Sequence, residues 1–222
     1  MIQQLQALDG QLFTAINSMH SAYFDSYMWL VSARWSCVLI VAALLYVFYT
    51  KGWRQLLVAV CAVLLLVLLA DQTASGIIKP LVERLRPSHD PAFAGTIHTV
   101  NGYLGGQYGF VSSHAANNFG VALFLALAVR NRWATVAMML WAVLISYSRI
   151  YLGVHFPGDI LGGALVGMAA AAVVYACWLW AERKCLHVQP RGLFEARDGK
   201  IIAITVACNL LIIALVASFC KF

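Results

Sequence analysis

The chain has 222 residues, of which 62% are hydrophobic and 11% are charged, whereas roughly 25% of the residues of a typical soluble domain carry a charge. One globular core cannot bury so much apolar surface, so a soluble protein is excluded and a single membrane domain over residues 1–222 is predicted. The net charge of +6 does not indicate a nucleic-acid partner, because positive cytoplasmic loops or an anionic ligand account for it.

The predicted path begins with an amphipathic helix over residues 2–17, whose apolar residues recur at helical spacing, so that it lies in the membrane interface. The second apolar run is expected to continue as helix to Arg86 and to stop before Pro87. The predicted fold is therefore an all-α integral membrane bundle of six transmembrane helices with an N-terminal amphipathic interfacial helix. The spans are expected at residues 27–49, 56–78, 113–130, 133–152, 159–181 and 201–219.

Lysine and arginine residues set the predicted orientation, because the side that is richer in them faces the cytoplasm. The richer side holds the connections after the first, third and fifth spans, with Lys51, Arg54, Arg130, Arg132, Arg183, Lys184, Arg191, Arg197 and Lys200. The other side carries Lys79, Arg84, Arg86, Arg149 and Lys221. We therefore predict a multi-pass protein of the inner (cytoplasmic) membrane, with both termini and the loops 87–111 and 153–158 facing outward.

The first polar cluster on the outward side contains Lys79 and Arg86, which are seven residues apart and fall on one face of the expected helix. A compact ammonium and a planar guanidinium together suit the several oxygens of a phosphate. Glu83 is expected on the same face, where it would hold both cations in place. Asp71 and Ser75 precede Lys79 at intervals of four, so they either extend this pocket inward or form buried interhelical hydrogen bonds. Snorkelling side chains beside lipid headgroups are the alternative for the cations.

The second cluster consists of Ser112, Ser113 and His114 and comes directly before an apolar helix. Small hydroxyl residues cap helix N-termini, and the free N–H groups there attract anions with the help of the helix dipole. His114 would lie at the edge of such an anion site. An ordinary serine cap with an unrelated histidine is the alternative.

The third cluster begins at Arg149, where the fourth span ends, and extends to His155 and Asp159 across a Pro-Gly turn. The spacing of four lets the Asp159 carboxylate accept a hydrogen bond from one nitrogen of His155, which fixes the tautomer and leaves the other nitrogen free. An imidazole held in this way can act as a nucleophile. A capped turn between two helices is the alternative.

Taken together, the three clusters predict a phosphate pocket on one face of the membrane. Phosphoryl transfer mainly requires positive charge around the oxygens of the transferred group and an in-line arrangement of attacking and leaving atoms. The three cations and the amides of residues 112–114 would supply the charge, and the two histidines would supply a nucleophile and an acid.

The same residues resemble the signature of the type 2 phosphatidic acid phosphatase (PAP2) superfamily, whose pattern is KxxxxxxRP, then PSGH, then SRxxxxxHxxxD. Residues 79–87 match the first motif and residues 148–159 match the third. The middle motif departs from the pattern, because Val111 stands in place of proline and Ser113 in place of glycine. The resemblance covers a catalytic core of residues 79–159, and the flanking segments match only in their membrane character.

Carried over position by position, the resemblance implies a metal-independent bacterial lipid phosphatase that needs no cofactor and works through a phosphohistidine intermediate. His155 would be the nucleophile, Asp159 would orient it, and His114 would protonate the leaving oxygen. The residues implied to bind phosphate are Lys79, Arg86, Ser112, Ser113 and Arg149. The implied substrate is a membrane lipid of the undecaprenyl diphosphate, lipid A, phosphatidylglycerophosphate or phosphatidic acid type, with its headgroup at the outer face.

Two other functions are compatible with the same pocket. A phosphotransferase would pass the phosphoryl group to an acceptor lipid or sugar instead of water. An anion transporter would use the cations for binding alone, but transporters usually show repeats or pairs of broken helices, and none is evident. A transporter would also leave the pairing of His155 with Asp159 unexplained. The leading prediction is therefore a lipid phosphate phosphatase.

Overall fold

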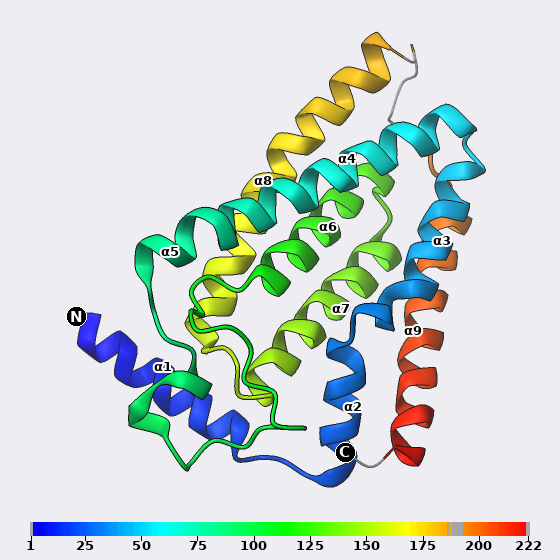
Figure 1. Cartoon of the computed structure of the whole chain (residues 1–222). Coiled ribbons are helices and arrows are strands. Elements are labelled where there is room, and N and C mark those ends of the chain that lie inside the picture. Colours follow the sequence, from blue (N-terminus) through cyan, green and yellow to red (C-terminus); the bar gives the residue numbers. More distant parts are fainter. Residues whose placement is uncertain (1, 186, 188–192, 221–222) are drawn as a thin grey trace.

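A computed structural model of the chain describes residues 2–185, 187 and 193–220 (Figure 1). Apart from one isolated bridge between Leu85 and Tyr108, the described residues form helices and loops only, which confirms the all-α prediction. The α-helices are α1 (Ile2–Asn17), α2 (Ala22–Ser32), α3 (Val38–Tyr49), α4 (Trp53–Asp71), α5 (Lys79–Val82), α6 (Ser113–Val129), α7 (Arg132–Tyr151), α8 (Pro157–Lys184) and α9 (Ala196–Phe219). The short turns are η1 (Arg34–Cys37), the π-helical η2 (Gln72–Ile78), η3 (Pro87–His89) and η4 (Pro91–Phe93). Arg191 and Lys221, which entered the charge comparison, lie outside the described residues.

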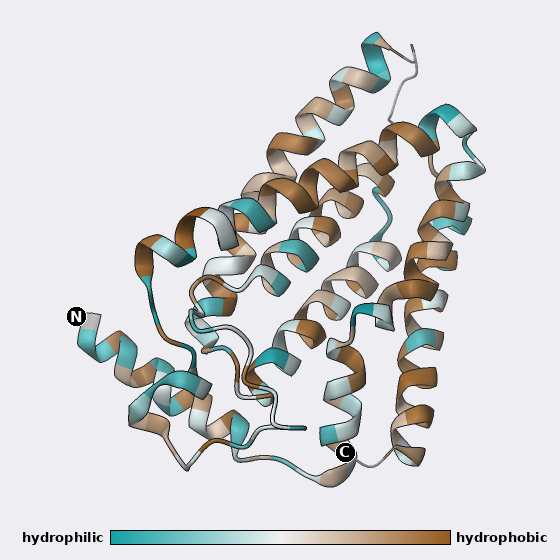
Figure 2. Ribbon diagram, in the orientation of Figure 1, coloured by the Kyte–Doolittle hydropathy of each residue, from teal (hydrophilic) through white to brown (hydrophobic). Residues whose placement is uncertain are grey.

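Four helices are long and apolar enough to cross a membrane: the continuous Trp53–Val82 segment, which comprises α4, η2 and α5, and the helices α7, α8 and α9. Helix α2 and the η1–α3 segment meet this criterion only as a pair bent by 67°. Helix α6 is apolar but has 17 residues, which is about 26 Å of helix against a hydrocarbon core of about 30 Å. The described residues therefore support four or five spans. The predicted total of six, which would include α6, stays a prediction. Figure 2 shows the hydrophobic colour along α3, α4 and α9 and hydrophilic colours in α1.

Helix α1 forms over the expected residues, and its two sides differ. Phe13 is buried and packs edge-on against the ring of Phe156 at 5.4 Å between ring centroids. The exposed side chains of this helix include Leu5, Leu8 and Leu12. One side of α1 is thus anchored on the bundle, and the exposed leucines suit an interfacial location, which stays a prediction.

The first predicted span is wrong as a single helix. The backbone is extended at Ala33, with φ −68° and ψ 143°, and this residue separates α2 from η1. Side chains satisfy backbone groups that the break leaves free: the Ser36 hydroxyl donates to a carbonyl of α2 at 2.9 Å, and Asn209 of α9 donates to the Ser36 carbonyl at 2.9 Å. The break also brings Ser32 beside Arg149.

The helix that contains the second predicted span covers residues 56–78 as expected but does not continue to Arg86. The helix stops with α5, and Glu83 adopts the left-handed conformation with φ 50°. Arg86 therefore does not share a helical face with Lys79, and Glu83 is exposed and forms no ion pair with either cation among the described residues. The physical reason is a competing pairing, because the Arg86 N–H donates to the Gln107 carbonyl at 3.0 Å and draws the chain away from the helix.

Helix α6 lies at the centre of the bundle, against α4, α7 and α8 (Figure 1). Its close approach to α8 depends on glycine, because a Cβ atom at Gly167 would overlap the Ala116 carbonyl and one at Gly163 would overlap that of Ser112. The Ser112 N–H in turn donates to the Asp159 carbonyl at 2.9 Å. This packing fixes the N-terminus of α6 beside the first turn of α8.

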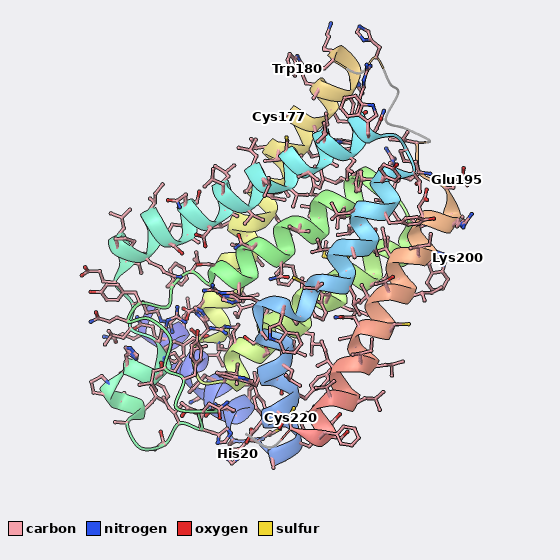
Figure 3. All side chains as sticks on the ribbon, turned by 45° about the vertical axis from the view of Figure 1, so that its right-hand side comes forward. His20, Cys177, Trp180, Glu195, Lys200 and Cys220 are labelled. Atoms are coloured by element: carbon pink, nitrogen blue, oxygen red, sulfur yellow. The ribbon has the colours of Figure 1, made fainter. Side chains whose placement is uncertain are left out.

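The connections gather at two ends of the bundle. In Figure 1, α1, the long loop between α5 and α6 and the turn between α7 and α8 lie at one end, while the α3–α4 and α6–α7 turns lie at the other. Figure 3 places His20 and Cys220 at the first end and Glu195 at the second. This arrangement agrees with the predicted path, in which the loops 87–111 and 153–158 share a side.

Candidate active site

The turn between α7 and α8 holds His155 against Asp159, as the spacing predicts. Nδ1 of His155 lies 3.2 Å from Oδ2 of Asp159, and the two side chains are 1% and 0% exposed. On the opposite edge of the ring, Nε2 lies 3.0 Å from Nη1 of Arg86. A guanidinium can only donate, so Nε2 carries the lone pair and Nδ1 carries the proton. These contacts select the tautomer in which Nε2 can act as a nucleophile.

The electrostatic surroundings keep His155 neutral. Burial lowers the pKa of His155 well below its usual 6.5, and the nearby positive charges of Arg86, Arg149 and Lys79 lower it further. A backbone hydrogen bond to Gly109 opposes this shift only in part. The imidazole is therefore uncharged at pH 7, which is the form that a nucleophile needs.

Asp159 is held from several sides. Its Oδ2 also accepts the Phe156 N–H at 3.0 Å, at the start of α8. Its Oδ1 accepts from Nη1 of Arg84 at 3.0 Å, and Nη2 of Arg84 lies 2.6 Å from Oδ2 of Asp9 in α1. Sequence reasoning missed Arg84 and Asp9, because no motif spacing connects these positions. The one available signal was the place of Arg84 among the basic residues of the outward side.

Lys79 reaches the start of α6 through a chain of hydroxyl groups. Its Nζ donates to Oγ of Ser113 at 2.8 Å, and Ser75 Oγ lies 2.7 Å from the same oxygen. Ser75 also donates to Oδ1 of Asp71 at 3.5 Å. Asp71, Ser75 and Lys79 thus lie on one face of the same helical segment. Ser75 and Lys79 both bond to Ser113 of α6, which makes the hydrogen-bond chain interhelical.

Ser112 shapes the N-terminus of α6. Its Oγ accepts the Ala115 N–H at 3.4 Å, and its own N–H is used by Asp159. The side chain is fully buried at 0% exposure. The N–H of Ser112 is therefore engaged within the protein, whereas its hydroxyl accepts one hydrogen bond and can still donate its own proton. The N–H groups of Ser113 and His114 have no partner among the described residues. Of the three amides at residues 112–114, these two therefore have a free N–H for an anion.

Arg149 is buried at the end of α7, with a side chain 4% exposed. Its Nη1 donates to Oγ of Ser32 at 2.5 Å, and its Nη2 donates to the Tyr103 hydroxyl at 3.0 Å. Its Nε is buried and has no partner among the described residues. Neither Ser32 nor Tyr103 was predicted to bind this arginine, because both contacts depend on the bent first span and on the path of the long loop.

The predicted cations converge on the two histidines. Lys79, Arg86 and Arg149 each interact electrostatically with both His114 and His155. The three sequence clusters thus form one positively charged site at the end of the bundle that carries the long loop (Figure 1). Such a site can bind a phosphate and present a neutral imidazole to it. Within the described ranges, no group of three or more His, Cys, Asp or Glu side chains is placed to hold a metal ion.

A bundle of apolar helices with a positively charged site at one end is the arrangement that an integral-membrane phosphatase needs. The chain belongs to the PAP2 superfamily, whose family model matches residues 55–183 and so contains all three motifs. A lipid A 4'-phosphatase of Porphyromonas gingivalis is 39% identical over 186 residues, which cover 83% of this chain and 79% of the relative. A lipid A 4'-phosphatase of Bacteroides thetaiotaomicron is 40% identical over 169 residues, which cover 75% of each chain.

The fold has a solved counterpart. The crystal structure of a transmembrane PAP2 type phosphatidylglycerolphosphate phosphatase from Bacillus subtilis aligns with a TM-score of 0.60 at 26% identity, covering 82% of this chain and 89% of that one. Family, relatives and fold agree, and the protein is a membrane lipid phosphatase of the PAP2 superfamily.

Proposed function

We propose that the protein hydrolyses the phosphate headgroup of a lipid A type substrate at the periplasmic face, through a phosphohistidine intermediate on His155. The observation that carries this proposal is the state of His155, which is buried and neutral, with Nδ1 bonded to Asp159 and Nε2 beside Arg86. The two relatives that are lipid A 4'-phosphatases support the substrate class. Undecaprenyl diphosphate, phosphatidylglycerophosphate and phosphatidic acid are the substrates to compare with it.

In the first step, Arg86 gives up its hydrogen bond to Nε2 and donates to the phosphate instead. The freed Nε2 lone pair of His155 attacks phosphorus while the bond from phosphorus to the lipid oxygen breaks. His114 carries a proton while the negatively charged headgroup is bound, because that charge offsets the surrounding cations, and it gives this proton to the leaving oxygen. The cations and the two amides at the start of α6 neutralise the oxygens of the transferred group, and the unpartnered Nε of Arg149 is one donor for them. Asp159 stabilises the positive charge that develops on the imidazole.

In the second step, water attacks the phosphohistidine, and His114, now neutral, takes the proton from that water. The bond between Nε2 and phosphorus breaks, and inorganic phosphate leaves. An acceptor hydroxyl in place of water would make the same pocket a phosphotransferase, so the release of free phosphate separates the two reactions.

The active site is assigned to the periplasmic side on the strength of the charge distribution. The loops that carry the site lie at the end of the bundle opposite the α3–α4 and α6–α7 turns. Those turns and the helix starts that follow them contain Lys51, Arg54, Arg130 and Arg132. Accessibility of a C-terminal tag in intact cells tests this orientation, since exposure of the tag to the cytoplasm would contradict it.

The function is tested by measuring phosphate release from the four lipids in detergent micelles, with the His155→Ala protein as the control. We expect the fastest release from lipid A, an acid-labile phosphoenzyme in the wild-type protein and neither signal in the variant. Full turnover by His155→Ala, or no phosphate release from any of the lipids, would contradict the proposal.

A further inference from the structure

A polar link joins helix α1 to the turn that carries the histidine. Arg84 uses one nitrogen for each of two carboxylates, with Nη1 at 3.0 Å from Asp159 and Nη2 at 2.6 Å from Asp9. The second oxygen of Asp9 accepts the Gly158 N–H at 2.7 Å. A Cβ atom at Gly158 would lie 2.7 Å from Oδ2 of Asp9, so a larger residue here would require the Asp9 carboxylate to shift. Three segments that are far apart in the sequence thus form a closed set of contacts.

Arg84 supplies the positive charge that pairs with the buried carboxylate of Asp159. The carboxylate is fully buried, and a buried charge is stable only when it is paired. His155 and the Phe156 N–H use Oδ2, so Oδ1 is left for a cation, and Arg84 takes it. The guanidinium also lies over the Phe156 ring, 4.2 Å from its centroid, which restricts its movement.

The proposed reaction requires a fixed charge and orientation of Asp159. Attack by His155 leaves positive charge on the imidazole, so Asp159 has to stay ionised and directed at Nδ1 throughout the step. Arg84 favours the ionised carboxylate and fixes its rotation through Oδ1. Asp9 holds the second arm of Arg84 and, through Gly158, the backbone of the same turn.

We propose that Arg84 and Asp9 are positioning residues that act through Asp159. Through Asp9, helix α1 then helps to hold the catalytic turn in place. The inference rests on the proposed roles of His155 and Asp159. The PAP2 family model matches residues 55–183, so Arg84 and Asp159 lie inside the matched region and Asp9 lies outside it. Neither residue is proposed to contact the substrate, so their loss should slow the chemical step and leave substrate binding unchanged.

The test is steady-state and quenched-flow kinetics of the full chain in detergent micelles, with lipid A as the substrate. We expect Arg84→Gln to lower kcat and the rate of phosphoenzyme formation about 10- to 100-fold, the range that small misplacements of a reacting group cause. KM should change less than about twofold, because ground-state binding is untouched. Arg84→Lys should recover part of kcat, because it keeps the charge beside Asp159.

Asp9→Asn should lower kcat by a smaller factor, and the double variant should be no slower than Arg84→Gln alone, because the two residues act in one chain of contacts. Lys51→Gln is the matched control. The ion pair between Lys51 and Asp198 has a similar length, 2.7 Å, and is buried to a similar degree at 12% and 8% exposure. Lys51 lies in the α3–α4 turn, at the opposite end of the bundle, so kcat should not change.

Several results would overturn the inference. Unchanged kcat in a folded Arg84→Gln protein would do so, as would a raised KM with unchanged kcat, which would indicate contact with the substrate. Multiplying losses from Arg84→Gln and Asp9→Asn would show that the residues act independently. If Arg84→Gln does not fold, Arg84→Lys and Asp9→Asn decide the matter, and unchanged kcat in both refutes the link. Failure of the wild-type protein to release phosphate from any lipid would instead refute the proposed function.

Discussion

Replacement of Asp159 by asparagine tests the tautomer mechanism most directly. Asparagine keeps the volume of the carboxylate but has one oxygen and one NH2 group. The structure places donors on both sides of residue 159: His155 Nδ1 at 3.2 Å and the Phe156 N–H at 3.0 Å on Oδ2, and Arg84 Nη1 at 3.0 Å on Oδ1. In either orientation, the new NH2 group therefore faces a donor.

The size of the effect follows from these contacts. If the NH2 group faces His155, the ring has to carry its proton on Nε2, and the nucleophile is lost. If it faces Arg84, the partly buried guanidinium loses one of its two carboxylate partners. A wrong imidazole tautomer costs about 10⁴-fold in kcat in Ser-His-Asp triads, which is about 5 kcal/mol of transition-state stabilisation. One unpaired buried group should also lower the free energy of unfolding by about 1–3 kcal/mol.

The assay compares phosphate release, the acid-quenched phosphoenzyme and thermal denaturation of wild-type and Asp159→Asn protein. Asp198→Asn is the control, because Asp198 occupies the same third position of a helix and accepts the Glu195 N–H at 2.7 Å while pairing with Lys51. We expect Asp198→Asn to lose stability but not kcat. A folded Asp159→Asn protein with kcat within tenfold of wild type would refute the reasoning.

Three further predictions follow from the same structure. His155→Ala should abolish phosphate release and the phosphoenzyme while leaving the circular dichroism spectrum unchanged. Because the pKa of His155 in the folded protein lies well below the usual 6.5, unfolding takes up a proton below about pH 6.5, so thermal stability should fall as the pH decreases from 7.5 to 5.5, and His155→Gln should reduce that fall. Gly167→Ala should lower the free energy of unfolding by about 1–3 kcal/mol, because the added Cβ atom overlaps the Ala116 carbonyl.

Each of these predictions has its own contradicting result. Phosphoenzyme in the His155→Ala protein would point to a different nucleophile. An identical pH dependence of stability in His155→Gln would show that this histidine does not titrate on unfolding. Gly106→Ala is the control for the packing prediction, since an added Cβ atom there meets nothing within 4 Å. Equal stability of Gly106→Ala and Gly167→Ala would contradict the close approach of α6 and α8.

Features that depend on neighbouring residues were predictable from the sequence. His155 and Asp159 are four residues apart at the start of α8, so their contact follows from local geometry. The start of α6 at Ser113 likewise follows from hydroxyl residues placed before an apolar run. The family motifs are built from such local patterns, which is why the resemblance was visible without a structure.

The incorrect predictions lie where long-range contacts override local preference. The helix of the second span was expected to continue to Arg86, but pairing of that residue with Gln107 draws the chain out of the helix. The first span was expected as one helix over residues 27–49, but it breaks at Ala33, where Ser36 and Asn209 satisfy the backbone groups that are freed. Hydropathy over a window of residues detects neither contact, because the partners lie elsewhere in the chain.

By itself, the sequence determined that the protein belongs in a membrane, that its polar clusters share one side and that His155 is oriented by Asp159. Only the tertiary structure decided that Arg84 bridges Asp159 and Asp9, which is 75 residues away from Arg84 in the sequence. It also decided that Arg149 lies between Ser32 and Tyr103. The physical reason is that such contacts depend on how helices pack and where they break, and the periodicity of a single helix carries no information about its neighbours.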